Sequence, residues 1–164
     1  MSKSRKIRTI LYRRKRIGKT DYKKRLALLK NKSPRLVIRR FNKNIIAQII
    51  SYEENGDKIE AQAHSKELEK LGWKGSKNNV PASYLVGMLL AKKSKAKNAI
   101  LDVGLQQPTK GSRIYACLKG AVDGGIKVPH SPEVLPKIER IEGKHIEGKD
   151  MTKAISEIKQ KIKG

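Results

Sequence analysis

The segment from Tyr12 to Arg25, YRRKRIGKTDYKKR, concentrates side chains that can bind phosphate. Eight of its fourteen residues are lysine or arginine, and Asp21 is its only acid. Arginine offers planar, bidentate donors that fit phosphate oxygens, and lysine adds a mobile point charge. Gly18 would let the backbone approach a partner closely, and Tyr12 and Tyr22 can stack or donate to phosphate. The segment therefore predicts a polyanion contact, although its charge alone does not choose between RNA and duplex DNA.

The charge of the whole chain supports this interpretation. The 164 residues carry a formal net charge of +24. Residues 1–52 hold 18 lysines and arginines and one acid, a net +17, whereas residues 53–164 hold 21 and 14, a net +7. A basic first third on a milder body is the electrostatic footprint of a polyanion binder, and solubility alone rarely requires so much charge of one sign.

Two further segments could contact a nucleic acid. Pro108 to Arg113, PTKGSR, is expected to join a strand to a helix whose free N–H groups attract phosphate. It lacks the spacing of a nucleotide-binding loop, so it predicts a clamp on a nucleic-acid backbone, with a solvated turn as the alternative. Trp73, in LGWKGSKNN, could stack on a base or cover the core, and the sequence leaves both interpretations open.

Groups suited to catalysis are sparse. Asp102 and Asp123 lie near the ends of expected elements and could hold Mg²⁺ in an RNA-processing nuclease, but we favour a cap for Asp123 and a loop-orienting role for Asp102. Cys117 has no partner for a disulfide and lies among apolar residues, as a core position would. No histidine has a second ligand at metal-binding spacing; the three are His64, His130 and His145. We therefore expect no enzyme activity, no cofactor and no metal.

The hydrophobic pattern predicts the elements that position these groups. Residues 1–19 lack a period and predict an extended arm, followed by a helix from Asp21 to about Asn31 with Thr20 as its cap. Strands are expected at 35–41, 45–53 and 58–64, with a type I′ turn at Asn55-Gly56. Helices are expected at 65–71, 81–97 and 111–122, and short strands at 99–103 and 126–128. Prolines exclude a long helix after Pro129, and a final helix is expected at 150–163.

These elements define an α/β fold: a mixed sheet, made of an antiparallel meander followed by a βαβ unit with a right-handed crossover, with helices packed on it. We divide the chain into a basic arm (1–19), a mixed α/β domain (20–146) and a C-terminal helix or tail (147–164), and we expect the arm and the domain to bind the polyanion. The most apolar run, 84–91, is too short to cross a bilayer, and the start lacks the apolar stretch of a signal peptide, so we expect a soluble intracellular protein.

Several long motifs resemble one protein family. RRKRIGKTDYKKRLALL, SPRLVIRRFNKNIIAQII, AHSKELEKLGWKG, ILDVGLQQPTKGSRIYACLKGAVDGGIKVPHSPEVLP and ERIEGKHI are similar to the archaeal form of the eighteenth large-subunit ribosomal protein. Its eukaryotic relative is a longer 5S rRNA-binding protein. The resemblance covers roughly residues 13–146. It implies a non-enzymatic protein of the large subunit's central protuberance in the cytoplasm, binding 5S rRNA, the large rRNA and a neighbouring 5S-binding protein, with no membrane, small-molecule or self-association partner.

The resemblance also implies RNA contacts at particular positions. The family's arm and first helix contact RNA, and its sheet and loops add further contacts. At the matching positions this chain has Arg13, Arg14, Lys15, Arg16, Lys19, Thr20, Tyr22, Lys23, Arg25, Arg39, Arg40, Asn42, Lys43, Asn44, His64, Trp73, Lys74, Thr109, Lys110, Ser112 and Arg113. Asn44 stands where the family pattern leads us to expect histidine. The alternatives are the nuclease described above and a DNA-architectural protein.

Overall fold

A computed structural model describes residues 9–107, 109–146 and 151–163. Its helices and strands are α1 (Arg13–Arg16), α2 (Tyr22–Leu29), β1 (Arg35–Arg40), β2 (Ile45–Glu53), β3 (Gly56–His64), α3 (Glu67–Lys70), α4 (Val80–Lys93), β4 (Ile100–Asp102), α5 (Arg113–Asp123), the 3-10 turn η1 (Pro132–Val134), α6 (Ile138–Ile141) and α7 (Met151–Lys163). The described strands form one sheet in the order β3-β2-β1-β4. β1 pairs antiparallel with β2, β2 with β3, and β4 lies parallel to β1. The predicted mixed α/β fold is confirmed.

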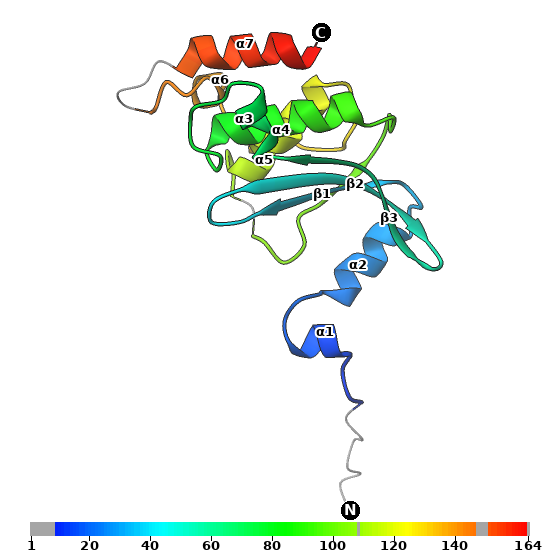
Figure 1. Cartoon of the computed structure of the whole chain (residues 1–164). Coiled ribbons are helices and arrows are strands. Elements are labelled where there is room, and N and C mark those ends of the chain that lie inside the picture. Colours follow the sequence, from blue (N-terminus) through cyan, green and yellow to red (C-terminus); the bar gives the residue numbers. More distant parts are fainter. Residues whose placement is uncertain (1–8, 108, 147–150, 164) are drawn as a thin grey trace, which may run out of the picture.

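The two faces of the sheet have different coverings. Figure 1 shows α4, α5 and α7 on one side, and α2 and α1 on the other. The face toward α4 is apolar because alternate strand residues point to it. Its buried residues are Leu36, Ile38, Ile45, Ala47, Ile49, Ala61 and Ala63. The opposite face carries Arg35, Arg39 and Gln48 together with the apolar Val37 and Ile50, and α2 lies on its side.

The helical layer depends on two glycines at the crossing of α4 and α5. A Cβ on Gly87 would lie 2.0 Å from the carbonyl oxygen of Cys117, and one on Gly120 would lie 2.0 Å from that of Tyr84. These helices therefore approach at backbone distance, which only glycine permits. The close crossing lets α4, whose residues 80–91 are all buried, form the centre of the core.

The C-terminal helix completes this core. Met151, Ile155, Ile158 and Ile162 form a stripe along α7 that is buried and belongs to the same hydrophobic cluster as α4. Lys159 places its Nζ 4.6 Å from the centre of the Tyr84 ring, a cation–π contact that holds the helix at its side. The predicted final helix is confirmed, and it docks on the body of the protein.

Several boundaries differ from the sequence-based expectation. The arm is not wholly extended, because Arg13–Arg16 form a short helix. Thr20 is not the cap of α2: the Asp21 carboxylate accepts from the N–H of Lys24 at 3.1 Å. α4 ends at Lys93 and not Lys97, since the Ser94 hydroxyl accepts from the N–H of Ala96 and diverts the backbone from the helix.

The last predicted strand and one turn are also corrected. At 126–128 the described chain makes only an isolated parallel bridge, between Lys127 and Asn98, because Pro129 has no N–H to extend the ladder. The parallel pair of the sheet is therefore β1 with β4. The β2–β3 hairpin is present, but its turn is not of type I′. That type requires a positive φ at both Asn55 and Gly56, and only Gly56 has one, at 145°.

No helix in the described ranges combines the length and the apolar character needed to cross a bilayer.

Candidate nucleic-acid interface

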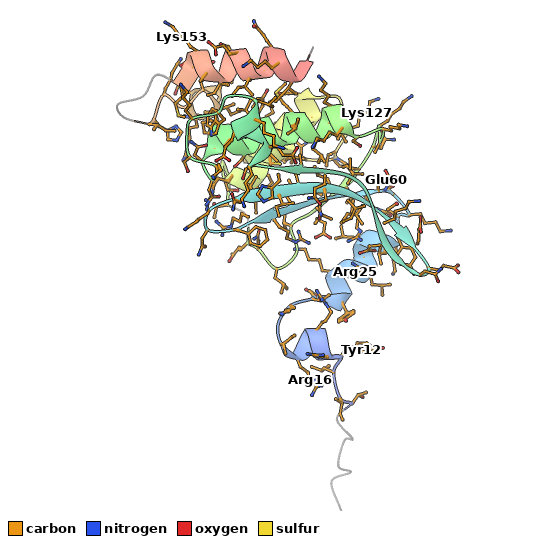
Figure 2. All side chains as sticks on the ribbon, viewed as in Figure 1. Tyr12, Arg16, Arg25, Glu60, Lys127 and Lys153 are labelled. Carbon is orange, nitrogen blue, oxygen red and sulfur yellow. The ribbon has the colours of Figure 1, made fainter. Side chains whose placement is uncertain are left out.

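The described part of the arm, from residue 9 onward, folds back on the helix that follows it. Arg14 donates from Nε to the Thr20 hydroxyl at 2.9 Å, and its carbonyl accepts from the N–H of Lys19 at 2.8 Å. The rings of Tyr12 and Tyr22 lie 5.2 Å apart, tilted by 46°. These contacts hold α1 beside the start of α2, and Figure 2 shows Tyr12 and Arg16 projecting away from the sheet.

The cations of this unit are available to a partner. Arg13, Arg14, Lys15, Arg16, Lys19 and Lys23 are exposed, and none forms an ion pair with a carboxylate in the part of the chain that the structure describes. Uncompensated, exposed cations on adjacent turns repel each other, and a polyanion relieves that repulsion. The structure therefore supports the arm as a phosphate-binding segment.

α2 is fastened to the sheet by polar contacts. Arg25 donates from Nη2 to both carboxylate oxygens of Asp57, at 2.8 and 2.9 Å. Lys24 donates from Nζ to the carbonyl of Gly104 at 3.1 Å. One helix thus touches the β2–β3 hairpin and the loop after β4, which are far apart in the sequence.

A chain of alternating charges continues across the sheet. Arg35 lies 2.8 Å from Asp57 and donates to Asp102 at 2.9 Å. Arg39 donates to the same Asp102 carboxylate at 3.0 Å and to its carbonyl at 2.7 Å. Arg35 is only 2% exposed, so its charge requires these carboxylates. The contact with Asp57 is an ion pair without hydrogen-bond geometry, and Nε and Nη2 of Arg35 lack a hydrogen-bond partner among the described residues.

Asp57 and Asp102, the two carboxylates of this series of ion pairs, are held in the ionised form. Burial by itself would raise the pKa of Asp102, but the charge of Arg39, the N–H of Gly104 and the bond from Arg35 together lower that pKa below its ordinary value. Burial likewise opposes ionisation of Asp57, whereas Arg35 and Arg25 prevail and lower the pKa of Asp57. Both acids are therefore negatively charged at neutral pH and neutralise the arginines that they contact.

A cleft of about 350 Å³ lies between α2 and the sheet. Its lining combines the arm, the ion pairs of the sheet and the loop after β4 with a few apolar side chains. The lining residues are Arg14, Lys19, Thr20, Asp21, Lys24, Arg25, Leu28, Arg35, Val37, Arg39, Ile50, Asp57, Asp102, Gly104, Leu105 and Gln106. The cleft therefore joins predicted RNA-binding residues of the arm to Arg39 on the sheet.

A second cluster of predicted residues lies at the other end of β1. Asn78 donates from its side chain to the carbonyl of Asn42 at 2.6 Å, and its own carbonyl accepts from Arg113 at 2.9 Å. Gln106 brackets Arg40, donating to its carbonyl at 2.8 Å and accepting from its N–H at 3.3 Å. Asn78 thus links the β1–β2 loop to the start of α5, and Gln106 links the loop after β4 to the end of β1. Sequence reasoning missed both, because neither belongs to a charged motif.

The electrostatics of this cluster favour an anion. Burial, and then the positive charge of Arg40, lower the pKa of Arg113. The side-chain oxygens of Asn44, Asn78 and Ser112 are buried without a hydrogen-bond partner among the described residues. Ser112 precedes α5 but its hydroxyl makes no capping bond. A phosphate beside Arg40 and Arg113 would relieve their repulsion.

Other predicted residues lie apart from these two clusters or are already engaged. Lys43, Lys74 and Thr109 are exposed, and Lys110 pairs with Glu133 at 3.2 Å. His64 is half-buried, and its Nδ1 accepts from the N–H of Lys66 at 2.9 Å. Trp73 is 3% exposed and donates from Nε1 to the Ser76 carbonyl at 3.1 Å. The structure therefore favours the core-covering alternative for Trp73, since a base cannot stack on a buried ring.

The carboxylates considered for metal chemistry have other roles. Asp102 accepts from the N–H of Gly104 at 2.8 Å, which confirms its loop-orienting role. Asp123 is not a cap: it accepts from the Tyr84 hydroxyl at 2.9 Å and from Lys119 at 2.7 Å. Within the described ranges no three histidines, cysteines or acids form a metal-ligand group. Cys117 is buried, as predicted, and burial raises the pKa of its thiol to about 12.

The lowered pKa of Asp102 predicts a pH-dependent stability. Its contribution to the free energy of unfolding is fully present above the ordinary value of 3.8 and is lost as the pH falls through the lower folded-state pKa, because the unfolded chain then binds the proton more tightly. We expect Asp102→Asn to cost about 2 kcal/mol at pH 7, and the deficit to shrink below about pH 4. Urea unfolding of both proteins from pH 7 to pH 3 measures this, and a deficit independent of pH would contradict it.

Comparisons with known proteins define the class to which this fold and basic surface belong. The model for the family described as ribosomal large subunit proteins 60S L5 and 50S L18 matches residues 7–99 and 93–131. The chain therefore belongs to this family of large-subunit ribosomal proteins. Among its relatives, the large ribosomal subunit protein uL18 of Korarchaeum cryptofilum (strain OPF8) is 56% identical over 140 residues, which cover 84% of this chain and 72% of the relative.

Membership of the family determines the general role. The chain is a structural component of the large subunit in cytoplasmic ribosomes, and it is not an enzyme. Its partners are ribosomal RNA and other ribosomal proteins. The resemblance found in the sequence is thereby confirmed, and the nuclease and DNA-architectural alternatives are set aside.

Proposed function

We propose that this protein binds 5S rRNA and helps attach it to the large rRNA in the central protuberance of the large subunit. The observation that carries the proposal is the unit of α1 and α2. Its exposed cations lack carboxylate partners in the described chain, and three of them, Arg14, Lys19 and Lys24, line a cleft beside the sheet. Phosphate contacts of this kind position a protein on RNA without reading its sequence. The arm, residues 1–19, supplies the larger share of the charge; residues 1–8 lie outside the described part.

The cluster of Arg40, Asn42, Asn78, Gln106 and Arg113 supports a second contact. It combines the guanidinium groups of Arg40 and Arg113 with amide groups, and such groups can bind phosphate and the edges of unpaired bases. We assign it to RNA, together with the remaining predicted residues of the β1–β2 loop and the 109–113 segment. A neighbouring 5S-binding protein is the proposed protein partner, in keeping with the resemblance that the sequence shows.

Binding to a 5S rRNA transcript tests this function. If six to ten phosphates are contacted, the affinity falls by about three to five orders of magnitude between roughly 50 and 200 mM salt. A duplex DNA of matched length, added as competitor at equal salt, should displace the RNA poorly. Filter binding over a salt series measures both quantities. A flat salt dependence, or equal competition by the DNA, would refute the proposal.

A further inference from the structure

The cleft between α2 and the sheet contains two acids, which are unexpected in a surface proposed to bind phosphate. Asp57 and Asp102 line the same cleft as Arg14, Lys19 and Lys24. A carboxylate beside a bound phosphate repels it, so an interface that only collected charge would omit both. Asp102 is explained by the buried Arg35, whose guanidinium it neutralises. Asp57 is different, because it also reaches out of the sheet to Arg25 on α2.

The contacts of Asp57 connect α2 to the sheet, and these two parts have few other contacts with each other. Asp57 lies on β3, next to the β2–β3 turn, and its side chain is 27% exposed. On one side it accepts two bonds from Arg25, and on the other it lies 2.8 Å from Arg35. α2 has no fully buried residue, so apolar packing does little to fix it on the sheet. Apart from Lys24 and Gly104, the Arg25–Asp57 pair is the polar contact that ties α2 to the sheet in the described chain.

We propose that Asp57 is a positioning residue for RNA binding: it fixes α2 against the sheet, so that the cations of the arm and those of the sheet meet one RNA as a single, preformed surface. The inference rests on the proposed function. Without this contact α2 would have to be ordered when the RNA binds, and the cost of that ordering would be subtracted from the affinity. Figure 2 shows Arg25 between the arm and the sheet, at the place where such a link acts.

The proposal and the net charge predict opposite changes in RNA affinity when Asp57 is replaced by asparagine. Asp57→Asn makes the protein more positive, so electrostatics alone predicts tighter RNA binding. We expect instead that its affinity for a 5S rRNA transcript falls about tenfold, from lost preorganisation. Glu60→Gln is the matched control, because Glu60 lies on the same strand, is exposed and forms no ion pair among the described residues. It removes the same charge, and we expect it to leave binding unchanged or to tighten it by about twofold at most.

A second variant separates positioning from folding. Arg25→Cys with Asp57→Cys removes both charges and allows a short bis-maleimide to restore the link covalently. The native thiol, Cys117, is buried and stays unmodified. Comparing the linked and unlinked forms of one variant cancels the loss of Arg25 as an RNA contact and any loss of stability. We expect the linked form to bind about tenfold more tightly than the unlinked form, and the salt slope of the unlinked form to be shallower.

The outcomes separate the two proposals. Wild-type protein that ignores the 5S transcript overturns the proposed function, and this inference with it. Wild-type binding together with tighter binding by Asp57→Asn, or with equal affinity of the linked and unlinked forms, overturns the positioning role alone. If Asp57→Asn unfolds, the linked and unlinked forms still decide the matter.

Discussion

Replacing Arg13, Arg14, Lys15 and Arg16 by glutamine is expected to weaken binding to 5S rRNA by about three orders of magnitude at about 0.1 M salt. Each lost phosphate contact lowers the salt slope by about 0.7 to 0.9, so four contacts remove roughly three units of slope. All four residues are exposed and the helix that they form buries nothing, so the melting temperature should stay within about 2 °C. Filter binding and a thermal melt measure the two effects.

A matched variant tests whether position or total charge matters. Lys92, Lys95, Lys97 and Lys127 are also exposed, and none forms an ion pair within the described ranges, but they lie near the end of α4, away from the cleft. Replacing all four by glutamine removes the same charge. We expect a loss of affinity of about tenfold or less, from the general field alone. Equal losses in the two variants would mean that the arm is not a specific contact.

Gly120→Ala is expected to destabilise the protein by about 3 kcal/mol. The new Cβ would lie 2.0 Å from the carbonyl oxygen of Tyr84, and backbone cannot rotate away as a side chain can, so α4 and α5 must separate. Separation disturbs a core that includes Leu85 and Leu118. At an uncrowded helix position the same change would stabilise by about 1 kcal/mol, so the sign of the effect is informative.

Urea unfolding of Gly120→Ala beside Lys119→Ala provides the measurement. Lys119 is the preceding residue on the same helix and pairs with Asp123 at the surface, so its loss should cost about 0.5 kcal/mol or less. A Gly120→Ala protein as stable as wild type would show that the helices cross at a greater distance than the structure indicates.

The parts of the fold that sequence predicts well are those governed by local pattern. β2 was predicted with its observed bounds, Ile45–Glu53, because an apolar run ends at the Asn55-Gly56 turn. The stripe on α7 is buried as its spacing requires, since a period of 3.6 residues places four apolar side chains on one face. Cys117 likewise lies in the core that its apolar neighbours indicate.

What sequence reasoning missed depends on contacts between distant residues. The chain from Arg25 through Asp57 and Arg35 to Asp102 joins four separate elements, and no local spacing reveals it. Asn78 and Gln106 are missed for the same reason, since they contact Asn42 and Arg40, which are distant in the sequence. Thr20 and Asp21 are both good caps, and the hydrogen bond from Arg14 to Thr20 leaves the capping role to Asp21. Only the fold determines such choices.

The arrangement explains how one small domain can be both rigid and strongly basic. Carboxylates pair with arginines that are buried, as Asp102 does with Arg35, while the arginines and lysines in the described part of the arm have no carboxylate partner among the described residues. The stability of the fold therefore comes from the packing of α4, α5 and α7 on the sheet. This apolar core offsets the repulsion between the cations on the opposite side, which would otherwise oppose folding.

Ultraviolet crosslinking of the protein to RNA in living cells, followed by sequencing of the bound RNA and mass spectrometry of the crosslinked peptides, tests the central claim most directly. The account predicts that 5S rRNA dominates the recovered RNA, with a smaller share of large-subunit rRNA. It also predicts that the crosslinks fall on residues 12–25 and on the loops that follow Arg40 and precede Arg113. Recovery of large-subunit rRNA without 5S rRNA, or crosslinks confined to α7, would contradict it.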